Sequence, residues 1–245
     1  MRIAFLSDIH GNYTALQAVL KDLETQRIDQ FVSLGDTITM GPQPLEVLNA
    51  LRELNCLCIK GNHDAAVLDP ENAEQYEITH HLVPDLYWCL KKLSPEDRAF
   101  IKTFNSMLTI QLPNGTKILA YHGSPLSFTD IIQATTPLEL LDKYFDGQTA
   151  DVFIGGHSHI QLVRRYGEKQ VLNSGSVGNT FRFPYSPGNP PSLLPWAEYI
   201  VIEQAGDVLS IQARRAYFDT NTLLKIVKES GLPGTAWWLR QYAKP

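Results

Sequence analysis

The 245-residue chain is poor in cysteine, with only Cys56, Cys58 and Cys89. Three cysteines exclude the disulfide framework that stabilises small secreted domains. They are also too few for a typical structural zinc site, whose cysteines come in spaced pairs. Cys56 and Cys58 lie inside the apolar run CLCIK. We therefore expect both in a strand of an ordinary globular protein.

Long apolar runs and clusters of positive charge are missing too. No run is long enough to cross a bilayer, and the start MRIAFLSDIHGN turns polar after one short apolar stretch, unlike a signal peptide. We therefore expect a cytoplasmic protein with no membrane partner. Lysine and arginine occur at most in pairs, and the formal net charge is -5. Because nucleic-acid affinity depends on positive groups that contact phosphates, we expect no general nucleic-acid binding.

What the chain does contain is an alternation of strands and helices in its first half. Apolar runs at 2–7, 30–35 and 56–60 have the length and composition of buried strands. Between the first two, Leu16, Val19, Leu20 and Leu23 follow the spacing of one helical face. This alternation predicts an α/β fold with a sheet that is parallel at least in this half.

The second half of the chain is richer in expected hairpins. Paired runs at 107–122, 160–175 and 197–216 predict three of them, and 150–156 reads as a further strand. Residues 76–104 look helical with an interruption near Pro84, and a last helix begins near Thr220. The segment 181–196 holds five prolines and predicts a loop. We expect one domain over 1–245, with a helical insertion at about 70–106 and the proline-rich loop at 181–196.

Polar side chains gather just past the expected strands. The clusters are SDIHGN, LGDT, KGNHD, YHGSP and GGHSH, and they hold five of the seven histidines. One histidine or Asp-Gly pair at a strand end usually makes only a turn or a surface hydrogen bond. Five such clusters, each containing glycine, favour a shared site instead, because ligands of α/β sheets bind beyond the carboxyl ends of the strands.

The side chains in these clusters have the chemistry of a metal site. Carboxylate oxygen, amide oxygen and imidazole nitrogen together suit Mn, Fe, Zn or Ni better than Ca or Mg. An aspartate between two clusters can bridge two ions, and the two histidines of GGHSH can give one imidazole to each. The sequence therefore predicts two divalent transition-metal ions, with Mn as the first expectation and Fe, Zn or Ni as alternatives.

In their order along the chain, the five clusters resemble the calcineurin-like metallophosphoesterases. The family pattern D-x-H, G-D, G-N-H-D, H and G-H-x-H is matched from residue 1 to about residue 178. SDIHGN and GSVGN are similar to the compact, YfcE-like branch of predicted bacterial phosphoesterases. The resemblance implies a four-layer α/β/β/α sandwich with two facing mixed sheets and both metals at the sheet edge.

The resemblance also implies a role for each matched residue. One metal would be held by Asp8, His10, Asp36 and His159, and Asp36 would bridge to a second held also by Asn62, His122 and His157. His63 matches the histidine that protonates the leaving group, with Asp64 placed to orient it. Asn12 and Arg182 are weaker candidates for contact with the substrate phosphate. The chain departs from the family at Ser174, where many relatives have proline.

The implied activity is hydrolysis of small-molecule phosphate esters, with phosphodiesters as the expected substrates. A metal-bound hydroxide would attack phosphorus, and His63 would be the general acid. Two alternatives stay open: a protein phosphatase or dinucleoside polyphosphate hydrolase, and a non-catalytic metal-binding scaffold for a protein or a phosphorylated partner. Serine catalysis is not expected, because neither Ser124 nor Ser176 lies in a strand-to-helix nucleophile elbow. The natural substrate and the oligomeric state are not readable from these residues.

Overall fold

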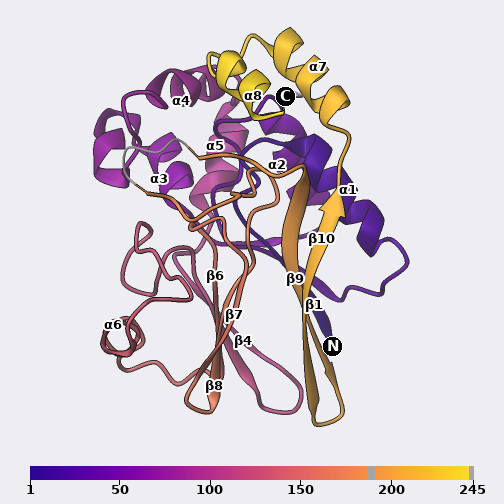
Figure 1. Cartoon of the computed structure of the whole chain (residues 1–245), viewed down its shortest axis with the longest axis vertical. Helices are drawn as coiled ribbons and strands as arrows, with labels where there is room; N and C mark the ends of the chain where they lie inside the picture. Colours follow the sequence, from indigo (N-terminus) through magenta and orange to yellow (C-terminus); the bar gives the residue numbers. More distant parts are fainter. Residues whose placement is uncertain (187–190, 243–245) are drawn as a thin grey trace.

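Two five-stranded sheets form the centre of the molecule in the computed structural model, which describes residues 1–186 and 191–242 (Figure 1). The first sheet has the order β10-β9-β1-β2-β3 and the second the order β4-β5-β6-β8-β7. The strands of the first sheet are β1 (Arg2–Leu6), β2 (Gln30–Ser33), β3 (Leu57–Cys58), β9 (Trp196–Ala205) and β10 (Val208–Tyr217). Those of the second are β4 (Leu108–Gln111), β5 (Lys117–Ala120), β6 (Val152–Gly155), β7 (Leu162–Tyr166) and β8 (Lys169–Asn173).

Both sheets are mixed. In the first, β1, β2 and β3 pair in parallel, whereas β9 runs antiparallel to β1 and to β10. In the second, β5, β6 and β8 are parallel, with antiparallel β4 and β7 at the two edges. The three expected hairpins are therefore β4-β5, β7-β8 and β9-β10. The expected strand at 56–60 is shorter, since β3 contains only two residues.

The helices lie on the outer faces of the two sheets and beyond the edge where the strands β1 and β6 end (Figure 1). They are α1 (Tyr13–Leu23), α2 (Pro44–Glu53), α3 (Asn62–Leu68), a 3-10 helix (Pro70–Tyr76), α4 (Val83–Leu90), α5 (Pro95–Lys102), α6 (Leu138–Tyr144), α7 (Thr220–Ser230) and α8 (Thr235–Gln241). The expected break near Pro84 falls at 77–82, and Pro84 itself lies in the first turn of α4, where proline is tolerated. Whether the segment at 70–106 is an insertion stays a prediction.

Alternating side chains of the strands explain the layers. Along β1, Ile3 and Phe5 face the second sheet and pack against Ile118 and Ile154 of β5 and β6. On the opposite face, Ala4 and Leu6 belong to the core under α1 and α2. A third core lies between α6 and the outer face of the second sheet. The four-layer α/β/β/α sandwich with two facing mixed sheets is thus confirmed.

Two expectations concern the carboxyl-terminal third of the chain. The helix expected near Thr220 is α7, although α8 follows it, and Trp238 of α8 is fully buried against Leu223 and Val227 of α7. Within the proline-rich segment, residues 187–190 lie outside the described part of the chain. Its described ends approach each other, since Phe181 pairs with Leu193 in an isolated antiparallel bridge.

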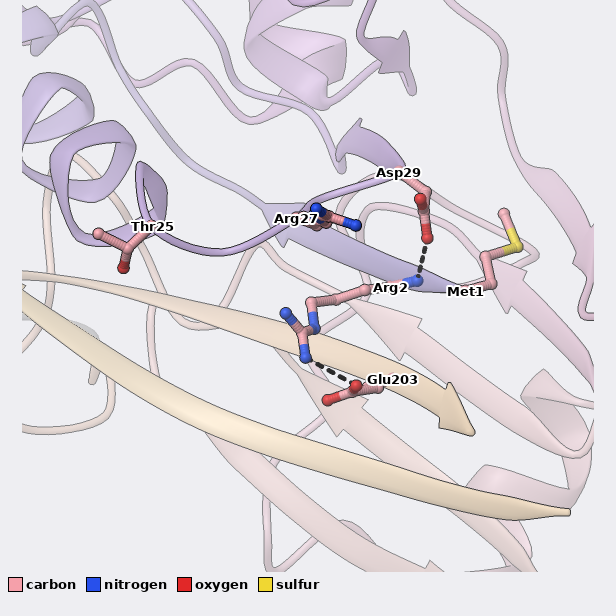
Figure 2. Close-up of a pocket in the computed structure, with 6 residues that line it drawn as sticks. All are labelled: Met1, Arg2, Thr25, Arg27, Asp29 and Glu203. Atoms are coloured by element: carbon pink, nitrogen blue, oxygen red, sulfur yellow. Dashed lines mark hydrogen bonds and ion pairs between the residues drawn. The ribbon is translucent and has the colours of Figure 1, made fainter. Parts of the chain in front are cut away.

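The amino end of β1 borders a shallow hollow of about 360 Å³ (Figure 2). There the Arg2 guanidinium contacts the Glu203 carboxylate at 2.7 Å, and the Arg2 backbone N–H donates to Asp29 Oδ2 at 2.7 Å. The lining side chains include no histidine. Among the helices of the described residues, none has an apolar stretch of the length needed to span a membrane.

Candidate metal centre

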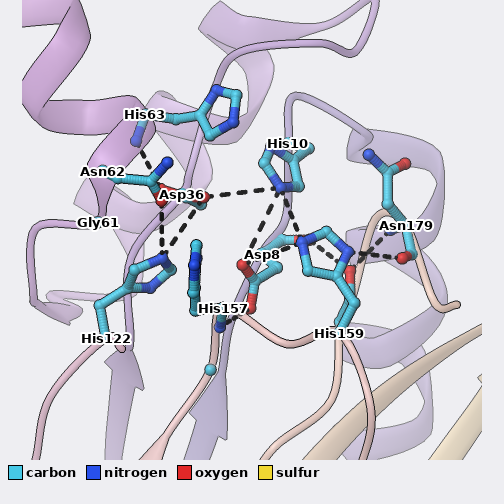
Figure 3. A network of polar contacts seen from close by, with 12 residues as sticks. Asp8, His10, Asp36, Gly61, Asn62, His63, His122, His157, His159 and Asn179 are labelled. Atoms are coloured by element: carbon cyan, nitrogen blue, oxygen red, sulfur yellow. Dashed lines mark hydrogen bonds and ion pairs between the residues drawn. The ribbon is translucent and has the colours of Figure 1, made fainter. Parts of the chain in front are cut away.

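The five polar clusters of the sequence meet at the opposite edge, where strands of both sheets end. Figure 3 shows eight of their side chains directed toward one another, and seven of the eight are buried. These eight are Asp8, His10, Asp36, Asn62, His63, His122, His157 and His159. The turns that follow β1, β2, β3, β5 and β6 thus bring together residues up to 151 positions apart, because the parallel strands of each sheet end at the same edge.

Tight turns aim these side chains inward. Asp8, His10, Asp36, His157 and His159 all have positive φ, between 47° and 63°. This left-handed conformation is uncommon for residues other than glycine and persists only where the surroundings enforce it. Cross-loop backbone hydrogen bonds enforce it here: Asp8 N donates to Gly35 O at 3.0 Å, and His10 N donates to Asp36 O at 2.9 Å.

Glycine is required where two turns touch. A Cβ on Gly61 would lie 2.1 Å from Asp36 Oδ1, and a Cβ on Gly156 would lie 1.8 Å from Ser7 Oγ. Both distances are far below van der Waals contact, so any other residue would push the turns apart. The glycines beside the expected ligands therefore allow the close backbone approach that the sequence suggested.

One group of donor atoms lies around Asp8. Its Oδ1 is 3.2 Å from His159 Nε2, which is itself 3.2 Å from His10 Nε2. The potential ligand atoms of these three residues all lie within 4.8 Å of one another. A carboxylate oxygen and two imidazole nitrogens thus face a single point.

A second group lies around Asp36. His122 Nε2 is 3.4 Å from Asp36 Oδ2 and 3.2 Å from Asn62 Oδ1. Ligand atoms of Asp36, His122 and His157 lie within 4.8 Å of one another. Asp36 Oδ2 is also 3.8 Å from His10 Nε2 of the first group. Asp36 therefore lies between the two groups, as expected for a bridging carboxylate.

Hydrogen bonds behind the site fix which atoms face it. His122 Nδ1 contacts Leu34 O at 2.8 Å, and His159 Nδ1 contacts Asn179 O at 2.7 Å. Because a carbonyl only accepts, each Nδ1 carries a proton, and each Nε2 is the ring nitrogen that faces the site and can bind a metal once the ring is neutral. The Asn62 amide donates to Tyr76 O at 2.9 Å, which leaves its oxygen facing inward. This donor set fits divalent metal ions.

Charge and burial divide the imidazoles of the metal edge into two pairs with opposite pKa shifts. Burial lowers the pKa of His10 to about 3 and that of His157 to about 4, so both imidazoles are neutral at pH 7. For Asp36, burial raises the pKa, but the attraction of His122 and His63 outweighs it and holds the pKa well below the usual range. Burial also lowers the pKa of His122, but the attraction of Asp36 outweighs it and raises the pKa to about 9; in the same way Asp8 raises the pKa of His159, so metal binding would displace a proton from each of these two rings.

His63 is positioned by Thr39, which the sequence analysis missed. The Thr39 hydroxyl lies 2.7 Å from His63 Nδ1, and the His63 ring meets the His10 ring edge-on at 4.9 Å between centroids. Burial lowers the pKa of His63. The only sequence signal for Thr39 is its place in the turn after Asp36. His63 thus directs its free ring nitrogen toward the metal edge.

The expectation that Asp64 orients His63 is wrong. The Asp64 carboxylate accepts hydrogen bonds from Asp36 N, Thr37 N and Gly61 N at 2.8, 3.0 and 3.0 Å. It therefore ties the turn of Asp36 to the turn of Gly61 and does not reach the imidazole. Burial raises its pKa to about 6.

The structure gives different roles to the two candidate phosphate contacts. Asn12 caps α1, with Oδ1 accepting from Ala15 N and Nδ2 donating to Gly178 O, each at 3.0 Å, and it is fully buried. Arg182 is exposed and contacts Ser192 Oγ at 3.4 Å. Neither lines the cavity beside the metal edge. In the structure Asn12 is thus a helix cap and Arg182 a surface side chain, and their contact with a phosphate stays a prediction.

A cavity of about 1450 Å³ opens from the metal edge. His10, Asp36, Asn62, His63, His157 and His159 line one end of it. The rest is lined by residues within 70–87, 131–133 and 234–240, together with Met40, Ser158, Phe181, Tyr185 and Pro191. Phe181 borders the metal edge itself, since its ring stacks on the His159 imidazole at 4.2 Å between centroids.

Residues 1–187 match the calcineurin-like phosphoesterase superfamily domain, more than half of the chain. The chain belongs to the calcineurin-like phosphoesterase superfamily. Membership makes it a hydrolase that acts on phosphoester bonds, in a superfamily that depends on divalent metals.

Three similar proteins place this phosphoesterase among its relatives. An uncharacterized protein (MJ0912) of Methanocaldococcus jannaschii is 27% identical over 236 residues, covering 94% of this chain and 93% of that protein. Serine/threonine-protein phosphatase 2 of Escherichia coli is 26% identical, covering 70% and 86%. The crystal structure of hypothetical protein PH1004 from Pyrococcus horikoshii superposes with a TM-score of 0.80 at 21% identity, covering 97% and 96%. This last likeness supports the fold.

Proposed function

We propose that this phosphoesterase hydrolyses phosphodiesters with two divalent transition-metal ions, of which Mn is the first candidate. The observation that carries the proposal is the position of Asp36 between two groups of inward-facing donor atoms. Asp8, His10 and His159 would hold one ion, and Asn62, His122 and His157 the other. Two ions so placed supply Lewis acidity and lower the pKa of a coordinated water.

The side chains around the ions perform the remaining work. His63 lies beside Asp36 and His10, with one ring nitrogen held by Thr39, so its other nitrogen can give a proton to the leaving alkoxide. Asp64 keeps the turns of Asp36 and Gly61 in register. The near-complete burial of these groups limits access of bulk water and strengthens their electrostatic effect on the phosphate.

The size of the cavity favours diesters over small monoesters. Drug-sized ligands occupy pockets of roughly 300–1,000 Å³, and this cavity of about 1450 Å³ exceeds that range. It therefore has room for organic groups on both sides of a phosphorus atom at the metal edge. A second candidate is protein phosphatase activity, which is favoured by the likeness to the E. coli serine/threonine-protein phosphatase.

The test is hydrolysis of bis(p-nitrophenyl) phosphate by metal-stripped protein with and without Mn, beside p-nitrophenyl phosphate and a phosphoserine peptide. We expect Mn-dependent turnover, faster for the diester than for either monoester. Asp36→Asn, which keeps the shape of the side chain but halves its ligand capacity, should reduce the rate to background. Metal content is measured on both proteins.

Other outcomes separate the alternatives. Faster turnover of the phosphopeptide would replace the diester proposal by protein phosphatase activity. Wild-type protein that binds two ions per chain but hydrolyses none of the three would favour a metal-binding scaffold.

A further inference from the structure

The part of the cavity beyond the metal edge has a composition of its own. We call it the outer chamber. It is lined by Met40, Pro70, Glu71, Ala73, Glu74, Glu77, Ile78, Thr79, His80, His81, Leu82, Val83, Asp85, Tyr87, Ile131, Gln133, Phe181, Tyr185, Pro191, Gly234, Trp237 and Arg240. None of these residues belongs to the five motifs of the metal edge, so metal binding does not account for their side chains.

Hydrogen bonds fix α8 over the outer chamber. The buried Trp238 indole N–H donates to Met40 O at 2.8 Å, four residues after Asp36. Gly234 N, next to the first turn of α8, donates to Asp85 Oδ1 of α4 at 2.7 Å. Gln241 Oε1 accepts from Leu193 N at 3.0 Å, which ties α8 to the segment that carries Tyr185. Trp237 and Arg240 are therefore held beside the metal edge.

The charge of the outer chamber is negative. Its described lining residues include four carboxyl side chains, Glu71, Glu74, Glu77 and Asp85, but only one guanidinium, that of Arg240, beside the imidazoles of His80 and His81. Proteins bind additional phosphates with clusters of arginine and lysine, because unscreened like charge repels the ligand. An outer chamber with four carboxyl groups and one guanidinium thus disfavours any substrate that carries phosphate beyond the one at the metals.

Aromatic rings supply the other contact surface. Phe181 stacks on the imidazole of His159, so it adjoins the site of the reacting phosphate. Tyr185 is 49% exposed, and Trp237 is partly exposed. Partly exposed aromatic rings that line a cavity can bind flat groups by stacking, with little dependence on the identity of the group.

We propose that the outer chamber binds a single flat organic group, a nucleoside or an aryl alcohol, and rejects substrates with a second phosphate. This proposal rests on the proposed phosphodiesterase activity and specifies its substrate class. The specificity-determining residues are Tyr185 and Trp237 for the ring, and Glu74 and Glu77 against further negative charge.

The test uses three diesters with the same leaving group on the Mn-loaded protein: methyl p-nitrophenyl phosphate, thymidine 5′-(p-nitrophenyl phosphate), and the latter bearing a 3′-phosphate. For wild type, we expect kcat/KM for the thymidine ester to exceed that for the methyl ester by roughly tenfold, from stacking. The 3′-phosphate should remove most of this gain. Tyr185→Ala and Trp237→Ala should each lower the thymidine-to-methyl ratio, while Tyr217→Ala, an exposed tyrosine of β10 outside the cavity, leaves it unchanged.

The charge contribution is tested with Glu74→Lys combined with Glu77→Lys, which should raise kcat/KM for the 3′-phosphate ester selectively. Because Tyr185 is half exposed, its alanine variant tests stacking even if Trp237→Ala fails to fold. A wild-type ratio near one, or faster hydrolysis of the 3′-phosphate ester, overturns the proposal while leaving phosphodiesterase activity intact. Absence of turnover of all three esters would overturn the phosphodiesterase proposal itself, and this one with it.

Discussion

The two ends of strand β1 differ in the exposure of their side chains and in the charged groups around them. At the amino end, Arg2 and Glu203 form an ion pair whose side chains are 28% and 30% exposed (Figure 2). At the carboxyl end, Asp8 and His10 are at most 1% exposed and lie among other titratable groups (Figure 3). The parallel strands beside β1 cause the difference, because their carboxyl ends deliver further turns to the same edge.

The difference between the two ends indicates where substitution of a charged residue should cost little stability. An exposed ion pair contributes roughly 0–1 kcal/mol, since water already solvates both charges. Buried charges are costly unless each is paired, hydrogen-bonded or bound to metal. Asp8 Oδ1 is a buried oxygen without a hydrogen-bond donor, although an imidazole nitrogen lies 3.2 Å away. The carboxyl end therefore suits a bound cation, whereas the amino end pairs its charges without one.

The largest effect is expected from Gly61→Ala at the metal edge. The new methyl group would lie 2.1 Å from Asp36 Oδ1, so the proposed bridging carboxylate must move. Displacement of a reacting group by about 1 Å can cost roughly a hundredfold in rate. Because the proposed ligand of both ions moves, we expect a still larger loss, to background, for bis(p-nitrophenyl) phosphate, with reduced metal content. Gly206→Ala in the β9-β10 turn, where the added Cβ meets nothing within 4 Å, should keep activity and metal and lose only some stability, because its φ of 59° disfavours alanine. Full metal content and wild-type rate in Gly61→Ala would contradict this account.

A smaller but selective effect is expected from His63→Ala. Loss of a general acid lowers rates by roughly 10²–10⁴-fold, and most for poor leaving groups. The variant should therefore lose more activity on diphenyl phosphate than on bis(p-nitrophenyl) phosphate, with metal content unchanged. Thr39→Val, which removes the hydroxyl that contacts His63 Nδ1 at 2.7 Å, should show the same selectivity with a smaller loss. If His63→Ala emptied the site of metal, His63 would be a ligand and its role as acid would be wrong.

The smallest effect is expected at the amino end. Arg2→Ala removes the contact with Glu203 but keeps the backbone bond from Arg2 N to Asp29. The free energy of unfolding, measured with urea, should fall by no more than about 1 kcal/mol, and kcat/KM should be unchanged. A change in kcat/KM would contradict this expectation, because it would show that the two ends of β1 are coupled.

The sequence was sufficient for most of the metal edge. Apolar runs mark the strands in the sequence, and Asp8, Asp36 and His122 follow shortly after those runs end. The layered fold and the convergence of the clusters could be predicted for the same reason. Local sequence also explains the start of α5, where Ser94 and Asp97 form a capping box.

Hydrogen-bond partners were less accessible from sequence. Asp64 adjoins His63 in the chain, yet it holds the backbone of Asp36 and Gly61, and Thr39 holds the imidazole. Asn12 lies two residues after a candidate ligand, yet both of its polar atoms bind backbone. Because residues that are neighbours in a turn direct their side chains differently, proximity in sequence did not predict which groups form hydrogen bonds.

The sequence by itself determined the ligand chemistry and the edge at which it gathers, because the order of strands and turns is local and parallel strands share their carboxyl ends. The tertiary structure alone decided the outer chamber. Tyr185 and Trp237 come from segments without a shared pattern, and they line one cavity only because Trp238 docks on Met40, 198 residues away. Such a contact depends on how elements far apart in the chain pack against one another. Local sequence periodicity carries no information about that packing.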